Sequence, residues 1–307
     1  MPGSPPALSD AYKARIDIHV SEGQRRKFRK AGFSKTRYLP LAANTTRRRP
    51  LQAHDPDLQN FASKVCFVGN STVSRIAPAA ETFLADHQSR FGPQAGSQAF
   101  LDSILRAQKA HPGEFVIPNL IETAYPGWRS HQELSGKYDP AMLAGEIAAA
   151  QRRLDMVSGL GTLNIEVWGD EGWKACEGSG ARYMGRAGHT HHLTAIYAAG
   201  QVHIDIGRLY QQDIVTMRVF DVLACGSFLI AEHSDALLAL FTPGVHLETW
   251  STPAELEEKA AWYLAHPEAR ERIAAAGLDR VRSHHSIRQR VGVMLESAQE
   301  QHQLQAG

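Results

Sequence analysis

Short apolar runs, each ended by glycine or a polar turn, recur along this chain and are separated by helical stretches. Short runs rich in β-branched and aromatic side chains predict strands. We predict strands over Lys64–Val68, Leu163–Trp168, Ala181–Met184, Val202–Ile206, Ser227–Ala231 and Val245–Trp250. Because these strands alternate with helices, the sequence predicts an α/β fold with a doubly wound parallel sheet.

The stretches between the later strands have apolar residues at helical spacing. We predict helices over Leu193–Ala199, Met217–Ala224, Pro253–Ala265 and Pro267–Ala276. Gly226 and Gly277 follow two of them, at the position where glycine commonly ends a helix.

Two segments do not fit a minimal sheet. The stretch from about Ala79 to Leu160 has no good strand but several helical patterns, which predict a helical insertion that forms a cap or a partner surface. Near the N-terminus, Ile16–Val20, Glu22–Ala31 and Thr36–Leu39 predict one strand-helix-strand unit.

The polar segment Asn44–Pro50 contains three consecutive arginines, Arg47, Arg48 and Arg49. We interpret it as a solvated linker rather than a nucleic-acid patch. The formal net charge of the 307 residues is only +1, from 33 Lys+Arg and 32 Asp+Glu. This balance argues against a general binder of nucleic acids or membrane surfaces.

Other sequence features narrow the class of protein. No apolar run reaches the roughly 18 residues of a membrane helix, and the start, MPGSPPALSD, lacks the basic and apolar regions of a signal peptide. Cys66, Cys176 and Cys225 have no CxxC spacing and indicate neither a disulfide framework nor a zinc ribbon. We expect a cytoplasmic protein with reduced thiols.

Six phrases along the chain resemble, in order, the GT-B glycosyltransferases, and in particular their CgeB-like (spore maturation protein) branch. The first is Asp17–Asn44, which resembles the passage from the N-terminal into the C-terminal domain of those enzymes. The others are Cys66–Asn70 with Arg75, Val167–Gly169 with Trp173, Tyr183–Gly185 with Ile196–Ala199, Arg218–Gly226, and a closing pattern from Glu255 to Arg290.

The resemblance implies a Rossmann-like nucleotide-sugar-binding domain of the GT-B C-terminal type over residues 46–290, with the helical insertion at 79–160. It implies that residues 1–45 are a remnant of the N-terminal domain with its linker, and that residues 283–307 form a C-terminal helix. Two strands cannot make a stable sheet alone. We therefore expect residues 1–40 to dock onto the helical insertion or a partner chain, which includes a second copy.

The activity that the resemblance implies is a glycosyltransferase of the hexosyltransferase type. The donor would be a nucleotide-diphosphate sugar, a UDP-sugar foremost, and the acceptor a glycan, a protein or a small molecule. No cofactor, metal, nucleic acid or membrane span is expected. Two alternatives stay open, a non-catalytic nucleotide-sugar-binding or scaffold protein and a sugar-nucleotide epimerase of the same architecture.

A transferase without a metal must hold a diphosphate that gains charge as the glycosidic bond breaks. Fixed cations, backbone amides and helix N-termini can do this. Gly69 ends the first strand and lets the backbone approach a phosphate, Asn70 can donate, and Arg75 is spaced to reach the same anion. The same residues also fit an ordinary turn with a surface arginine.

In retaining GT-B enzymes, two glutamates eight residues apart contact the donor sugar and the ribose. Here the matching positions are Asp213 and Asp221. The resemblance makes Asp213 the catalytic candidate beside the sugar and Asp221 the ribose contact, while Arg218 and the amides near Thr216 meet the phosphates. Aspartate is one methylene shorter than glutamate. Alternatively, Asp221 is a helix-start acid and Arg218 forms a surface salt bridge.

The nucleotide base needs a surface to pack on, and in this fold the loops after the second and third strands supply it. These loops carry Trp168 with Gly169 and Tyr183 with Gly185, although an aromatic residue that ends a strand also fits the core. The histidines in Gly188–His192 lack a convincing third ligand nearby, so we interpret them as a loop rather than a metal site.

Overall fold

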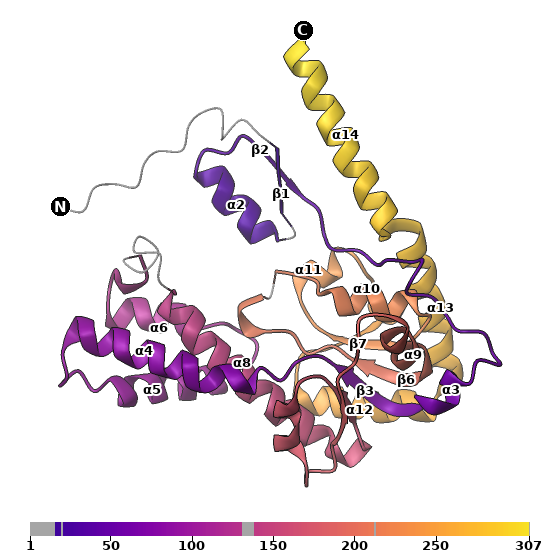
Figure 1. The fold of residues 1–307 in the computed structure, drawn as a ribbon, viewed down its shortest axis with the longest axis horizontal. Coiled ribbons are helices and arrows are strands. Elements are labelled where there is room, and N and C mark those ends of the chain that lie inside the picture. Colours follow the sequence, from indigo (N-terminus) through magenta and orange to yellow (C-terminus); the bar gives the residue numbers. More distant parts are fainter. Residues whose placement is uncertain (1–15, 20, 131–137, 212, 307) are drawn as a thin grey trace. The chain divides into compact units, whose positions relative to one another are not determined.

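A computed structural model describes residues 16–19, 21–130, 138–211 and 213–306 (Figure 1). Residues 1–15 and 131–137, which belong to the predicted N-terminal remnant and helical insertion, lie outside the described residues. The chain divides into two compact units. The first comprises residues 1–66, 187–205 and 212–307, and the second comprises residues 67–186 and 206–211.

The first unit contains a parallel sheet in the order β3-β6-β7-β8. The register pairs Val65 with Val202, His203 with Leu229, and Ile230 with Glu248. The central strands are apolar and buried because helices cover a parallel sheet on both faces. Their bounds are β3 (Ser63–Val68), β6 (Gly200–Ile204), β7 (Leu229–Glu232) and β8 (Glu248–Trp250).

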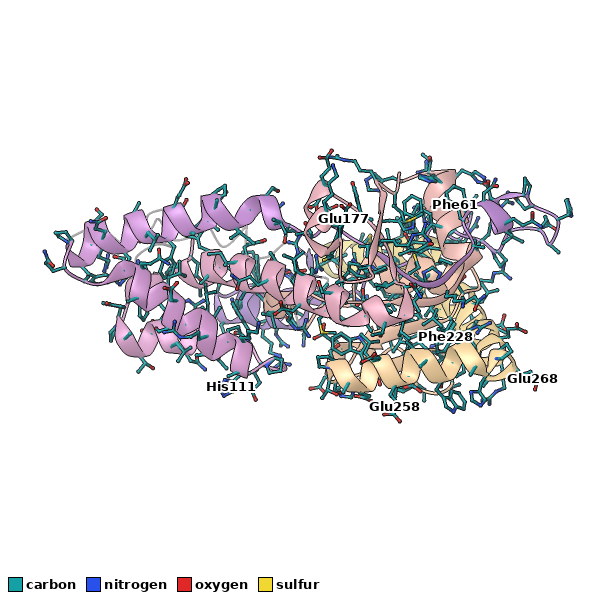
Figure 2. All side chains as sticks on the ribbon, turned by 90° about the horizontal axis from the view of Figure 1, so that it is seen from below. Phe61, His111, Glu177, Phe228, Glu258 and Glu268 are labelled. Carbon is teal, nitrogen blue, oxygen red and sulfur yellow. The ribbon has the colours of Figure 1, made fainter. Side chains whose placement is uncertain are left out.

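Helices follow these strands in the first unit. Thr252 begins one of them by accepting a hydrogen bond from the Glu255 amide, with Pro253 at the first helical position. Phe228 lies between that helix and the sheet, with its ring 4.3 Å from Tyr263, whereas Glu258 points away from the protein (Figure 2). The helices are α3 (Asp57–Asn60), α9 (His191–Ala199), α10 (Met217–Ala224), α11 (Asp235–Leu238), α12 (Pro253–Ala265), α13 (Pro267–His284) and α14 (Ile287–Ala306).

Helix α13 continues past Gly277, where the sequence predicted its end. The reason is close packing rather than a turn. A Cβ atom on Gly277 would lie 2.3 Å from the His246 carbonyl oxygen and 2.8 Å from Leu223 Cδ2. The glycine therefore lets the helix approach a neighbouring backbone, a role that sequence position alone does not distinguish from a C-cap.

The predicted N-terminal strand-helix-strand unit is confirmed as β1 (Ile16–His19), α2 (Glu22–Lys30) and β2 (Lys35–Tyr38), with β1 and β2 parallel. The Phe28 ring lies 4.4 Å from His19 and 4.9 Å from Phe33 and forms a small core. The segment continues into contacts with the end of the chain. Arg290 donates to the Pro40 carbonyl at 2.8 Å, and Ala43 pairs with Ser286.

The second unit joins a strand pair to a helical subdomain. Strand β4 (Glu166–Trp168) pairs with β5 (Arg182–Gly185) and with the end of β3. The helical insertion consists of helices that lie side by side (Figure 1) and bury a core around Phe83, Ile121 and Trp128. They are α4 (Ile76–Phe91), α5 (Ser97–Ala110), α6 (Ile117–Ala124) and α8 (Pro140–Gly159).

Strand β4 begins later than the sequence predicted. Residues Leu160–Leu163 form a 3-10 helix that continues the last turn of α8. Asn164 then has φ 53° in the left-handed region, which breaks the helix before the strand begins.

Candidate functional site

The predicted site residues are divided between the two units. Asp213, Thr216, Arg218 and Asp221 belong to the first unit, and the other seven belong to the second.

Asp205 organises the start of α10 in the first unit. It follows the last residue of β6, is 5% exposed, and accepts hydrogen bonds from Thr216 Oγ1 at 3.1 Å and from Arg218 Nη1. Thr216 precedes the helix but gives its hydroxyl to Asp205, so no side chain caps this helix start in the described structure. The sequence analysis missed Asp205, although an acid at the end of the apolar run VHIDI was a usable signal.

The pair of Arg218 and Asp205 is well buried, with side chains 13% and 7% exposed. A fixed guanidinium thus lies beside the start of an eight-residue helix. Helix starts carry partial positive charge, and an arginine guanidinium carries five N–H donors. This arrangement can hold an anion such as a phosphate.

Asp221 is held by Arg48, which the sequence analysis placed in a solvated linker. That interpretation is wrong for Arg48, which is 7% exposed. Its Nε donates to Asp221 Oδ2 at 3.1 Å, and its Nη atoms donate to Thr194 Oγ1 at 2.8 Å and to the Thr190 and His189 carbonyls at 3.0 and 3.1 Å. Burial raises the pKa of Asp221, and the Arg48 guanidinium opposes that rise.

Asp221 therefore serves a structural ion pair through Oδ2. Its Oδ1 makes no hydrogen bond within the part of the chain that the structure describes. The residue is 8% exposed, so any ribose contact would use this second oxygen.

Asp213, the catalytic candidate, contacts the start of α2. Its Oδ2 accepts hydrogen bonds from the Gly23 amide at 3.0 Å and from Ser21 Oγ. Ser21 in turn caps the helix by accepting from the Gln24 amide at 3.1 Å. The carboxylate thus joins the N-terminal strand-helix-strand unit to the loop before α10, within the first unit.

In the second unit, position 169 requires a glycine because its backbone lies close to the residue that follows β3. A Cβ on Gly169 would lie 2.2 Å from the Gly69 carbonyl oxygen. That oxygen accepts from Trp173 Nε1 at 2.7 Å, and the Gly69 amide donates to the Trp168 carbonyl at 2.8 Å. Trp168 is buried at 7% exposure.

The remaining residues predicted to pack on the base lie on β5 and beside β4. Tyr183 Oη donates to the Gly169 carbonyl at 3.4 Å. Gly185 has φ 98°, a conformation that favours glycine, and its carbonyl accepts from the Gly169 amide at 2.9 Å.

The loop after β3 is held by two residues that the sequence analysis missed. Asp170 accepts from the Ser71 and Thr72 amides at 3.2 and 3.1 Å. Arg153, 5% exposed on α8, donates to the Asn70 carbonyl at 2.8 Å. The Ser71 and Thr72 amides are thus already hydrogen-bonded to Asp170, and the Asn70 carbonyl to Arg153.

Arg75 belongs to a different cluster in the second unit. Its side chain is 59% exposed and lies 3.5 Å from Glu146 Oε1, which also accepts from Tyr210 Oη. Arg208 Nη1 lies 3.6 Å from the same oxygen. Burial and the Glu146 carboxylate raise the pKa of Tyr210 to about 12, so its hydroxyl stays protonated and donates.

The histidines of Gly188–His192 make separate contacts. His191 Nε2 lies 2.8 Å from Asp57, and His192 Nδ1 accepts from the Gly188 amide at 3.4 Å. Among the described residues, no three histidine, cysteine or acidic side chains converge as metal ligands do. No helix of the described structure has the length and apolar character needed to cross a membrane.

Comparisons with known proteins agree with this architecture. Residues 147–296 match the glycosyl transferase-like family. The chain is similar in structure to sucrose-phosphate synthase from Thermosynechococcus elongatus, with a TM-score of 0.54, 13% identity, and coverage of 94% of this chain and 58% of that chain. It is also similar to a glycosyltransferase from Rickettsia africae ESF-5, with a TM-score of 0.53, 10% identity, and coverage of 96% and 68%. No curated protein sequence matches the chain.

These likenesses establish the fold as that of GT-B glycosyltransferases. The residues that match the glycosyl transferase-like family model include Asp213, Arg218 and Asp221. The chain spans 58% of the length of the sucrose-phosphate synthase.

Proposed function

We propose that this chain binds a nucleotide-diphosphate sugar, with UDP as the nucleotide, and transfers its glycosyl group to an acceptor. The observation that carries the proposal is the buried Arg218 beside the uncapped start of α10, within the matched residues 147–296. In the transfer, the bond between the anomeric carbon and the diphosphate oxygen breaks. The acceptor oxygen bonds to that carbon and loses its proton, and the electron pair leaves with the diphosphate. Arg218 and the helix start would stabilise the added charge.

The finer assignments rest on the resemblance of the sequence. We place the chain in the CgeB-like branch and in the cytoplasm. We assign residues 46–290 to donor binding with an insertion at 79–160, residues 1–45 to an N-terminal remnant with its linker, and residues 283–307 to a closing helix. Asp213 is proposed beside the sugar and Asp221 at the ribose, with Gly69, Asn70, Arg75, Trp168, Gly169, Tyr183, Gly185 and Thr216 completing the donor site.

A thermal-shift panel of UDP, GDP, TDP and CMP tests the proposal. Saturation at 100 times Kd stabilises a protein by about 2.7 kcal/mol. We expect UDP to raise the melting temperature most. A flat panel would contradict the proposal.

The variant Arg218→Lys keeps a positive charge beside Asp205 but removes the planar guanidinium, which can donate two parallel hydrogen bonds to a phosphate. We expect it to weaken UDP binding about tenfold in calorimetry because two directed hydrogen bonds to phosphate are lost. The exposed Arg288 provides the matched control, Arg288→Lys, with unchanged affinity. If Arg218→Lys and Arg288→Lys bound UDP with equal affinity, Arg218 would not belong to the donor site.

A second candidate function is non-catalytic nucleotide-sugar binding. The observation that favours it is the Asp213 carboxylate, which is occupied by Ser21 and Gly23. The two candidate functions are distinguished by measuring release of UDP from UDP-sugars in the presence of glycan, protein and small-molecule acceptors. Binding without turnover of any donor supports the second candidate.

A further inference from the structure

A cavity of about 430 Å³ lies between residues 46–55 and the start of α9, inside the first unit. Its volume is within the range of small-molecule sites. None of the residues predicted for the donor site lines it. The arginine run contributes two of its lining residues, Arg47 and Arg49.

Arg47 and Arg49 do not support the fold through their guanidinium groups. Both side chains are exposed, and neither makes a hydrogen bond or ion pair within the described residues. Their backbone is nevertheless fixed. The Arg47 amide donates to the Asn44 carbonyl at 3.0 Å, the Arg47 carbonyl accepts from Thr194 Oγ1 at 3.1 Å, and the buried Arg48 anchors the residue between them. Because this backbone is already ordered, binding a ligand to the two guanidinium groups would cost little backbone entropy.

The charge around the cavity is positive. Arg47 and Arg49 face a single lining carboxylate, Asp55, and the lining His191 is already paired with Asp57. Thr190 makes no side-chain cap at the start of α9, which adds partial positive charge to the same wall. A dianion is the ligand that two arginines bind best.

The rest of the lining suits hydroxyl groups. Asp55 accepts hydrogen bonds, Gln52 both donates and accepts, and the hydroxyls of Thr46 and Thr190 do the same. Apolar contact is limited to the Pro50–Leu51 side of the cavity. A bare phosphate would leave most of this volume unfilled.

We propose that this cavity binds a sugar phosphate, separate from the donor site. The phosphate lies between Arg47 and Arg49, and the sugar hydroxyls face Gln52 and Asp55.

Calorimetric titration of the full chain with glucose 6-phosphate tests this site, with glucose and inorganic phosphate as the partial ligands. The double variant Arg47→Gln, Arg49→Gln should lose affinity for glucose 6-phosphate at least about tenfold, since each charged donor contributes a strong hydrogen bond. Both arginines are exposed, so the variant should keep the melting temperature of the parent protein. Arg288→Gln is the control for overall charge, with unchanged affinity.

Arg218→Lys separates this site from the start of α10. The proposal expects it to bind glucose 6-phosphate like the parent protein, whatever it does to UDP. Loss of binding in Arg218→Lys but not in the double variant would overturn the proposal. The proposal would also be overturned if glucose 6-phosphate showed no saturable binding, or if inorganic phosphate bound as tightly as glucose 6-phosphate.

Discussion

Arg48 links three parts of the first unit through one side chain. It hydrogen-bonds the carboxylate of Asp221 on α10, the hydroxyl of Thr194 on α9 and two carbonyls just before α9. A buried charge of this kind is tolerated only when it is paired and its donors are used. Its neighbours Arg47 and Arg49 face the cavity instead, so consecutive arginines have opposite roles.

Replacing Arg48 by methionine should lower the free energy of unfolding by about 3–5 kcal/mol, because Asp221 is left as a buried, unpaired charge. Urea denaturation measures this loss. Arg47→Met, at an exposed position, should change stability by less than about 0.5 kcal/mol. Adding Asp221→Leu to Arg48→Met should recover much of the loss, because both charges are then absent. Equal stability of Arg48→Met and Arg47→Met would mean that the ion pair contributes nothing.

At the scale of elements, two helical glycines provide a matched test. Gly277 in α13 has no room for a Cβ, whereas a Cβ on Gly292 in α14 would meet nothing within 4 Å. Alanine favours helix by up to about 1 kcal/mol over glycine. We expect Gly292→Ala to stabilise by up to that amount, and Gly277→Ala to destabilise by about 1–3 kcal/mol through overpacking. If the urea midpoints of Gly277→Ala and Gly292→Ala shifted in the same direction, helix propensity alone would account for both stability changes.

The contact between Asp213 and α2 predicts a local effect on dynamics. Asp213→Ala removes the acceptor of Ser21 and Gly23, so amides of residues 22–30 should exchange with deuterium about fivefold faster. Exchange in α10, residues 217–224, should not change. The surface variant Asp279→Ala is the control. Unchanged exchange over residues 22–30 would show that α2 does not depend on this carboxylate.

The elements were largely predictable because strand patterns and glycine ends are local properties. The six sheet strands and the N-terminal strand-helix-strand unit lie where the sequence predicted them, within a few residues. Partnerships across long separations were not predictable. Arg48 and Asp221 are 173 residues apart, and a run of three arginines is usually solvated. Gly277 shows the same limit, since its neighbour His246 belongs to another part of the chain.

For the whole molecule, acid should be destabilising because of buried neutral histidines. Burial lowers the pKa of His203 to about 4 from an ordinary value of 6.5. Between pH 6.5 and 4, His203 binds a proton in the unfolded chain but stays neutral in the folded protein. The stabilising contribution is therefore complete above pH 6.5 and is lost as the pH falls towards 4, with a size of about 3 kcal/mol.

Urea unfolding at a series of pH values measures this contribution. His203→Gln should flatten the fall in stability between pH 6.5 and 4, while the exposed His233→Gln should keep it. A slope that is the same in His203→Gln as in the parent protein would assign the acid sensitivity to other groups, such as His285, whose pKa is also lowered to about 4.

The division of the chain into two units also sets an order of events during synthesis. The second unit is nearly continuous, residues 67–186 with 206–211, whereas the first is assembled from three separate stretches. When the ribosome has made Arg48, its partners Thr194 and Asp221 do not yet exist. At typical elongation rates they follow on the order of ten seconds later. Throughout that interval Arg48 lacks its buried partners, and the basic residues of α2 and the arginine run favour solubility of the nascent N-terminal stretch.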